Sequence, residues 1–247
     1  MSNVNRTELA AADSTTGHLL SLGVLGAAVL TFVASWLLLL QWVDEAATVA
    51  GLPVLNLLGA GLVVIGGGLA FVGVGSRLGY VDTAPSSTAG VVVGAVFGLL
   101  WAILGGLVGT LALGDATVRW LPVAAVFGVG GFLGAVVPRE DVGSTIPVAA
   151  VLLLLGGVIA TDGIGAGWTW SPAWSSAEFP GSELVPILVV FGTLLGAWSA
   201  GKAKEGFGAE GRQAGAYYLI GSVVFAMLAV LALLIAFIVT NGLQTML

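Results

Sequence analysis

Cysteine is absent from this chain of 247 residues, and histidine occurs only once, as His18. The chain therefore forms no disulfide, binds no metal through thiolates and has no cysteine nucleophile. A metal site built on several histidines is excluded in the same way. We expect no enzymatic activity, no metal and no cofactor, and the sequence singles out no catalytic residue.

Charged residues are scarce as well. They make up 8% of the chain, against about 25% in soluble domains. Hydrophobic residues make up 58%, and the mean hydropathy is +1.09. The net charge of −6 argues against nucleic acid as a partner, because binding to it requires a basic surface. This composition indicates a membrane protein that is in contact with lipid.

Long apolar runs predict an all-α fold, a polytopic transmembrane bundle of about seven spans. About 20 apolar residues cross the hydrocarbon core of a bilayer. The predicted spans are residues 19–43, 54–75, 89–113, 120–137, 145–161, 184–200 and 216–240, of which the fourth and fifth are short. The first run exceeds the apolar part of a signal peptide, about 7–15 residues, and is expected to remain as a helix. Residues 1–17 are polar and are predicted to form a short mobile cytoplasmic tail.

Basic residues predict how these helices are oriented in the cell membrane. If the N-terminus is cytoplasmic, the outer segments contain a single basic residue, Arg119. The inner segments then contain Arg6, Arg77, Arg139, Lys202, Lys204 and Arg212. Because basic loops are retained in the cytoplasm, we expect the N-terminus inside and the C-terminus outside. Residues 198–215 are predicted to be a basic inner loop that contacts anionic lipid or docks a cytoplasmic partner.

An internal repeat predicts how the spans are grouped. Residues 47–54 (ATVAGLPV) and 116–123 (ATVRWLPV) are identical at six of eight positions, and residues 183–186 (ELVP) are a fainter third copy. Each copy places a proline near the start of an even-numbered span, where its missing N–H costs nothing. We expect three helical hairpins of the same orientation, followed by one unpaired helix.

Glycines and a few polar residues are expected to hold the helices together. Small residues four apart form one helix face and allow close crossing of membrane helices. The candidates are Gly90, Gly94, Gly98, Gly105 and Gly109 in the third span, and Gly130 and Gly134 in the fourth. Asn56 and Ser222 are expected to make hydrogen bonds between helices. No span has an ionisable residue in its middle, which argues against proton-coupled transport by this chain alone.

The outer segment 162–183 is rich in aromatic residues: Trp168, Trp170, Trp174 and Phe179. Aromatic side chains of this kind settle at the boundary between membrane and water. We expect an interfacial anchor or a short surface helix, with a ligand-stacking site as the alternative.

Residues 206–211 (GFGAEG) match the GxGxxG pattern of dinucleotide sites. That pattern binds a dinucleotide only where a strand delivers the glycines to a helix within a βαβ unit. Here a membrane helix precedes the glycines, so we interpret the match as chance.

The last predicted span carries a family resemblance. Residues 212–243 (RQAGAYYLIGSVVFAMLAVLALLIAFIVTNGL) have a basic lead-in, a long aliphatic helix and an exit of the form FIVxxGL. This stretch resembles the first core helix of phosphate ABC transporter permeases. The tryptophan-rich segment, the sequence KAKEGFGAEGRQ and this helix together resemble the N-terminal membrane region of such permeases from haloarchaea.

The resemblance implies a function and a division of the chain. Residues 18–201 would be accessory transmembrane hairpins, and residues 202–247 a basic inner loop with the first core helix. The chain would be an N-terminal portion of the permease component of an ABC-type phosphate importer. Its partners would be a second permease subunit, a cytoplasmic ATPase and an external phosphate-binding protein. No substrate-contacting residue can be carried over, because in that family the remaining core follows this helix. The alternative is a stand-alone structural membrane protein without transport activity.

Overall fold

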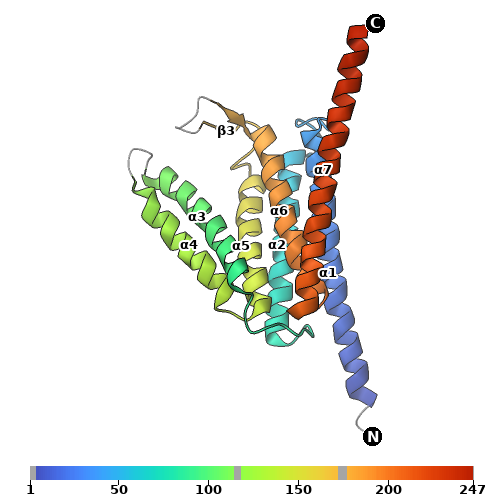
Figure 1. Ribbon diagram of the computed structural model, residues 1–247, viewed down its shortest axis with the longest axis vertical. Helices are drawn as coiled ribbons and strands as arrows, with labels where there is room; N and C mark the ends of the chain where they lie inside the picture. Colours follow the sequence, from blue (N-terminus) through green and yellow to red (C-terminus); the bar gives the residue numbers. More distant parts are fainter. Residues whose placement is uncertain (1–3, 114–117, 172–176, 247) are drawn as a thin grey trace.

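The computed structural model describes residues 4–113, 118–171 and 177–246, which fold into a bundle of α-helices (Figure 1). The helices are α1 (Val4–Leu39), α2 (Val54–Leu78), α3 (Val91–Leu113), α4 (Trp120–Val136), α5 (Glu140–Ala160), α6 (Gly181–Lys204) and α7 (Gly208–Met246). The prediction of an all-α membrane bundle is confirmed. Among the described residues α1, α2, α5, α6 and α7 are long and apolar enough to cross a membrane, and the chain is a multi-pass membrane protein.

The other two predicted spans correspond to shorter apolar helices, Val91–Gly106 and Trp120–Val136. The 17 residues of α4 extend only about 25 Å, less than the roughly 30 Å of the hydrocarbon core. The prediction of a short fourth helix is confirmed. The fifth is not short, because α5 begins at Glu140 and has 21 residues.

Polar residues extend the helices further than hydropathy predicts. The helix α1 begins at Val4, so most of the predicted tail is helical. The prediction that residues 198–215 form a loop is wrong, because α6 continues to Lys204 and α7 begins at Gly208. Only residues 205–207 connect these two helices.

The first and third hairpins together form the centre of the bundle. Helix α1 packs against α6, α2 packs against α5, and α2 also contacts α6. The two hairpins are equivalent in these contacts: the set stays the same when α1 is exchanged with α5 and α2 with α6. The centre is closed by side chains with 0% exposure: Leu62, Ile65, Leu69, Leu152, Val185 and Val189.

The middle hairpin, α3 and α4, leans away from this centre (Figure 1). Helix α4 contacts α5, and α3 reaches the centre through Phe97, which is 1% exposed. The ring centroids of Phe97 and Trp198 are 6.0 Å apart. The hairpins therefore do not follow one another around the bundle in chain order.

Each of the two central helical hairpins has a short antiparallel β-hairpin just before its second helix. Strands β1 (Thr48–Val49) and β2 (Leu52–Pro53) pair before α2, and β3 (Thr169–Trp170) and β4 (Phe179–Pro180) pair before α6. The structure thus supports a repeat of these two hairpins but aligns Pro53 with Pro180. The predicted third copy is wrong, because Pro186 lies inside α6.

The second copy does not adopt the same structure either. Pro122 is the third residue of α4, which confirms a proline in the first helical turn, but residues 120–122 are helical where Leu52–Pro53 form a strand. Residues 114–117, which include the start of this copy, lie outside the described residues.

The tryptophan-rich segment contains a β-hairpin. A short surface helix, one of the two forms expected there, is not what its described residues adopt. Trp170 and Phe179 pair across the strands, with ring centroids 5.6 Å apart. Trp174 lies outside the described residues.

Glycine spacing predicts the contact face of α3 correctly and that of α4 wrongly. Against α4 lie Gly94, Gly98, Gly105 and Gly109, whereas Gly90 precedes α3 with a φ of 94° and open space around it. On α4 the contacts to α3 come from Gly128 and Gly131, while Gly130 and Gly134 face open space. Four-residue spacing identifies one face of a helix but not which face meets a neighbour.

Helices α2 and α5 approach each other closely at Gly59 and Gly156. A Cβ atom on Gly156 would lie 2.6 Å from the carbonyl oxygen of Gly59 and 2.8 Å from Leu62 Cβ. A Cβ on the neighbouring Gly157 would meet nothing within 4 Å. We expect Gly156→Ala to destabilise the bundle by about 1–3 kcal/mol, because α2 would be pushed away. Thermal unfolding in detergent should show a lower midpoint for Gly156→Ala and little change for Gly157→Ala. Equal midpoints for the two variants would contradict this contact.

Candidate functional site

Basic residues gather at one end of the bundle, which we call the basic end. Helices α2 and α6 end there, and α5 and α7 begin there (lower part of Figure 1). The residues are Arg77, Arg139, Lys202, Lys204 and Arg212. Arg119 lies at the opposite end, before α4.

Glu140, the first residue of α5, is fully buried at the basic end and binds groups from three other segments. Its Oε1 atom lies 2.9 Å from Lys202 Nζ, in the last turn of α6. Its Oε2 atom accepts hydrogen bonds from the backbone N–H of Ser86, at 2.9 Å, and of Gly208, at 3.1 Å. Arg212 Nη1 lies 3.5 Å from the same oxygen. One carboxylate therefore connects the α2–α3 loop, α5, α6 and the start of α7.

Lys202 is buried to the same degree, with 1% of its side chain exposed. Apart from Glu140, its ammonium group has no hydrogen-bond partner among the described residues, and it lies 5.0 Å from the ring centroid of Trp198. The prediction that this lysine faces anionic lipid or a cytoplasmic partner is wrong. Lys204, two residues on, is partly exposed and pairs with Glu205 at 3.0 Å.

The turn between α6 and α7 directs the start of α7 toward Glu140. Gly206, Phe207 and Gly208 have φ angles of 69°, 66° and 65°. Glycine adopts this left-handed conformation readily, whereas phenylalanine does so at a cost. The Phe207 ring is buried against α2 and α6, and its N–H donates to the carbonyl oxygen of Lys202 at 2.9 Å. The positive end of α7 then stabilises the carboxylate. Two of the glycines of the GxGxxG match, Gly206 and Gly208, thus serve this turn.

The buried Asp141 carboxylate forms a second charge pair beside the first, with the partly exposed Arg139. Arg139 Nε donates to its two carboxylate oxygens at 3.1 Å and 3.0 Å, and Nη2 binds it as well. Ser76 Oγ from α2 donates to Asp141 Oδ2 at 2.8 Å and lies 2.6 Å from Thr83 Oγ1. Hydrogen bonding to Asp141 holds the pKa of Arg139 above its ordinary value, so the guanidinium stays charged. We call the groups around Glu140 and Asp141 the charge cluster.

Further hydrogen bonds tie the start of α5 to its neighbours. Ser199 Oγ of α6 donates to the backbone carbonyl oxygen of Ser144 at 2.8 Å. The backbone N–H of Glu140 donates to the carbonyl oxygen of Ser86 at 3.2 Å. The chemistry of the charge cluster is therefore that of a clamp: opposite charges and backbone groups from four segments neutralise two buried carboxylates.

The two polar residues singled out from the sequence have different roles. Asn56 Nδ2 donates to the carbonyl oxygen of Ala160 at 3.3 Å, which confirms a hydrogen bond between α2 and α5. Ser222 Oγ instead donates to the carbonyl oxygen of Tyr218 in its own helix, so that prediction is wrong. Sequence reasoning placed Glu140 and Asp141 in a loop and missed the charge cluster, whose members are far apart along the chain.

No protein-family model matches the chain, and no curated protein or solved structure is significantly similar to it.

Removing the charge of Glu140 tests the charge cluster. Glu140→Gln keeps the size of the side chain but leaves the Lys202 ammonium buried without an anion. We expect a loss of about 3–5 kcal/mol in the free energy of unfolding, as for other broken buried ion pairs. Equilibrium unfolding in detergent measures this loss.

A partly exposed pair, Lys204 and Glu205, provides the control. Lys204→Gln breaks the Lys204–Glu205 pair and should cost no more than about 1 kcal/mol. The double variant Glu140→Leu with Lys202→Met should recover much of the stability that Glu140→Gln loses, because no buried charge remains. Equal costs for Glu140→Gln and Lys204→Gln would show that burial of the first pair is misassigned.

Proposed function

We propose that the chain is the N-terminal membrane region of an ABC-type phosphate importer of the haloarchaeal kind, in the cell membrane. In this proposal α1–α6 form a scaffold that holds α7, the first helix of the permease core. The observation that carries the proposal is the exposure of α7, the helix on which the resemblance of residues 212–243 falls.

Helix α7 is anchored at one end and open along most of its length. Only 6% of the apolar 18-residue stretch within Gly208–Ala232 is buried, against 39% to 61% of the corresponding stretches of α1, α2, α5 and α6. It packs against α6, and the ring centroid of Phe225 lies 5.9 Å from that of Phe32 in α1. Figure 1 shows α7 continuing beyond the other helices at the end opposite the basic end. Such a helix is well placed to pack against further membrane helices.

The distribution of charge supports a scaffold that acts together with a separate transport path. In the five apolar stretches of the described chain, charged residues occur only near the ends. Ion and substrate paths in membranes require polar or ionisable groups within the span. Translocation of phosphate would therefore be carried out by helices that pack against α7.

Charge also supports an orientation and a set of partners. The basic end is assigned to the cytoplasm, because basic segments are retained there. The N-terminus is then inside and the C-terminus outside. The proposed partners are a second permease subunit, a cytoplasmic ATPase at the basic end and a phosphate-binding protein outside.

A second candidate function is that of a stand-alone structural membrane protein without transport activity. The self-contained centre of α1, α2, α5 and α6, locked by the charge cluster, favours this candidate. In that case the open face of α7 would contact lipid alone.

Site-specific photo-crosslinking separates the two candidates. Met227 on α7 and Val126 on α4 are apolar and 68% and 69% exposed, so they form a matched pair. A photoreactive amino acid at Met227 should crosslink to helices of the permease core in cells that express the importer, because α7 packs against them. The same group at Val126 should reach lipid only. Crosslinking is read by gel shift and mass spectrometry, and phosphate uptake is measured in a strain that lacks the chain.

Either of two results would decide for the structural protein. One is that Met227 and Val126 give the same lipid-only crosslinks. The other is unchanged phosphate uptake in the strain that lacks the chain.

A further inference from the structure

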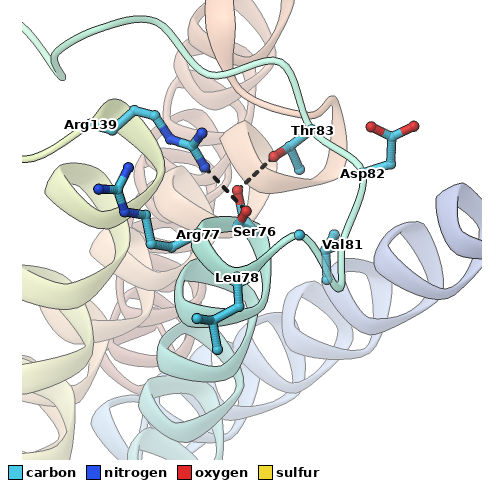
Figure 2. Close-up of a pocket in the computed structure, with 8 residues that line it drawn as sticks. Ser76, Arg77, Leu78, Val81, Asp82, Thr83 and Arg139 are labelled. Atoms are coloured by element: carbon cyan, nitrogen blue, oxygen red, sulfur yellow. Dashed lines mark hydrogen bonds between the residues drawn. The ribbon is translucent and has the colours of Figure 1, made fainter.

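An open pocket of about 540 Å³ lies beside the charge cluster, where α2 ends (Figure 2). It is lined by residues 76–79, 81–83 and Arg139. The hydroxyl groups of Ser76 and Thr83 and the apolar side chains of Leu78 and Val81 form part of its wall. Leu78 is 63% exposed, so the pocket borders on the apolar surface of α2.

Two guanidinium groups of this pocket have unused donors. Arg77 is exposed and makes no hydrogen bond or ion pair with the described residues. Arg139 uses Nε and Nη2 for Asp141 and Ser76, while its Nη1 has no partner among them. In the view of Figure 2 both guanidinium groups lie on one side of the pocket and the Asp82 carboxylate on the other.

We propose that this pocket binds a phosphate group through Arg77 and the Nη1 edge of Arg139. A guanidinium presents N–H donors in a planar fork that matches the oxygens of a phosphate. Asp141 already balances one of the two positive charges, so Arg77 supplies the net attraction. Asp82 repels an anion from its own side and restricts the phosphate to the side of the guanidinium groups.

Hydrogen bonds weaken the repulsion that the end of α2 would exert on an anion at this place. Carbonyl groups at a helix C-terminus would repel a phosphate. Here those of Gly75 and Ser76 already accept hydrogen bonds from the backbone N–H groups of Gly79 and Tyr80 and from Arg139.

The surroundings favour a phosphate carried by an anionic phospholipid of the adjoining leaflet. Its headgroup would occupy the pocket, and its acyl chains would lie along the exposed apolar side chains of α2, such as Leu78, Val74 and Phe71. Inorganic phosphate would bind to the same guanidinium donors, so the experiment has to distinguish it from the lipid. This inference does not depend on the proposed transport function.

Lipid binding to the purified full chain tests the site. The protein in detergent is titrated with phosphatidylglycerol, and bound lipid is counted by native mass spectrometry. Arg77→Gln should weaken binding about fivefold, the effect of one basic group near a membrane surface. The variant should fold normally, because Arg77 has no partner among the described residues. Arg77→Lys should retain most of the binding, and Asp82→Asn should strengthen it by removing the repelling charge.

Arg119→Gln is the matched control, since Arg119 is an exposed arginine at the opposite end of the bundle. It should leave phosphatidylglycerol binding unchanged. Equal effects of Arg77→Gln and Arg119→Gln would overturn the proposal, as would unchanged binding in Arg77→Gln together with Asp82→Asn.

A competition arm identifies the source of the phosphate. If a lipid occupies the site, inorganic phosphate displaces phosphatidylglycerol poorly, because the acyl chains contribute to its binding. Efficient displacement that is lost in Arg77→Gln assigns the site to soluble phosphate and overturns the lipid as its source. If neither ligand depends on Arg77, no phosphate site exists here.

Discussion

The Glu140 carboxylate has been removed from water, and the arrangement at the basic end follows from the need to stabilise it. Burying a charge without partners costs several kcal/mol, so each group around it has to be in place. The partners are an ammonium from α6, a backbone N–H from the α2–α3 loop and the positive end of α7. The Asp141 pair adds a link from α5 to α2. Two adjacent acidic residues thus bring four segments to one point.

This constraint explains why α7 can be exposed and still have a defined position. Most helices of the bundle are held by buried apolar faces, whereas α7 buries little of its surface. Its start is fixed instead by the left-handed turn at Phe207, by the hydrogen bond from Gly208 to Glu140 and by Arg212. The rest of the helix is free to contact other membrane components. A scaffold that presents one helix in this manner is the basis of the proposed function.

Local patterns in the sequence predict a good part of this fold. Apolar runs give the helices, and spacing gives the contact face of α3. Pro53 before α2 and the gathering of basic residues at one end of the bundle agree with paired hairpins. The pairing of α1 with α6 and α2 with α5 is tertiary and has no local signal. Lys202 and Glu140 were assigned to loops because they are charged. Whether a charge at a helix end is buried depends on a partner that lies far away in the chain.

Hydrogen exchange at the basic end tests the role of Glu140 most directly. The backbone N–H groups of Gly208 and Ser86 both donate to its carboxylate, although they belong to separate segments. In the Glu140→Gln variant we expect faster exchange in peptides that cover residues 84–86 and residues 206–212, because both segments lose the same charged acceptor. Exchange in α3 and α4 should not change. Unchanged protection of both segments in a folded Glu140→Gln variant would contradict the claim that this carboxylate holds the basic end together.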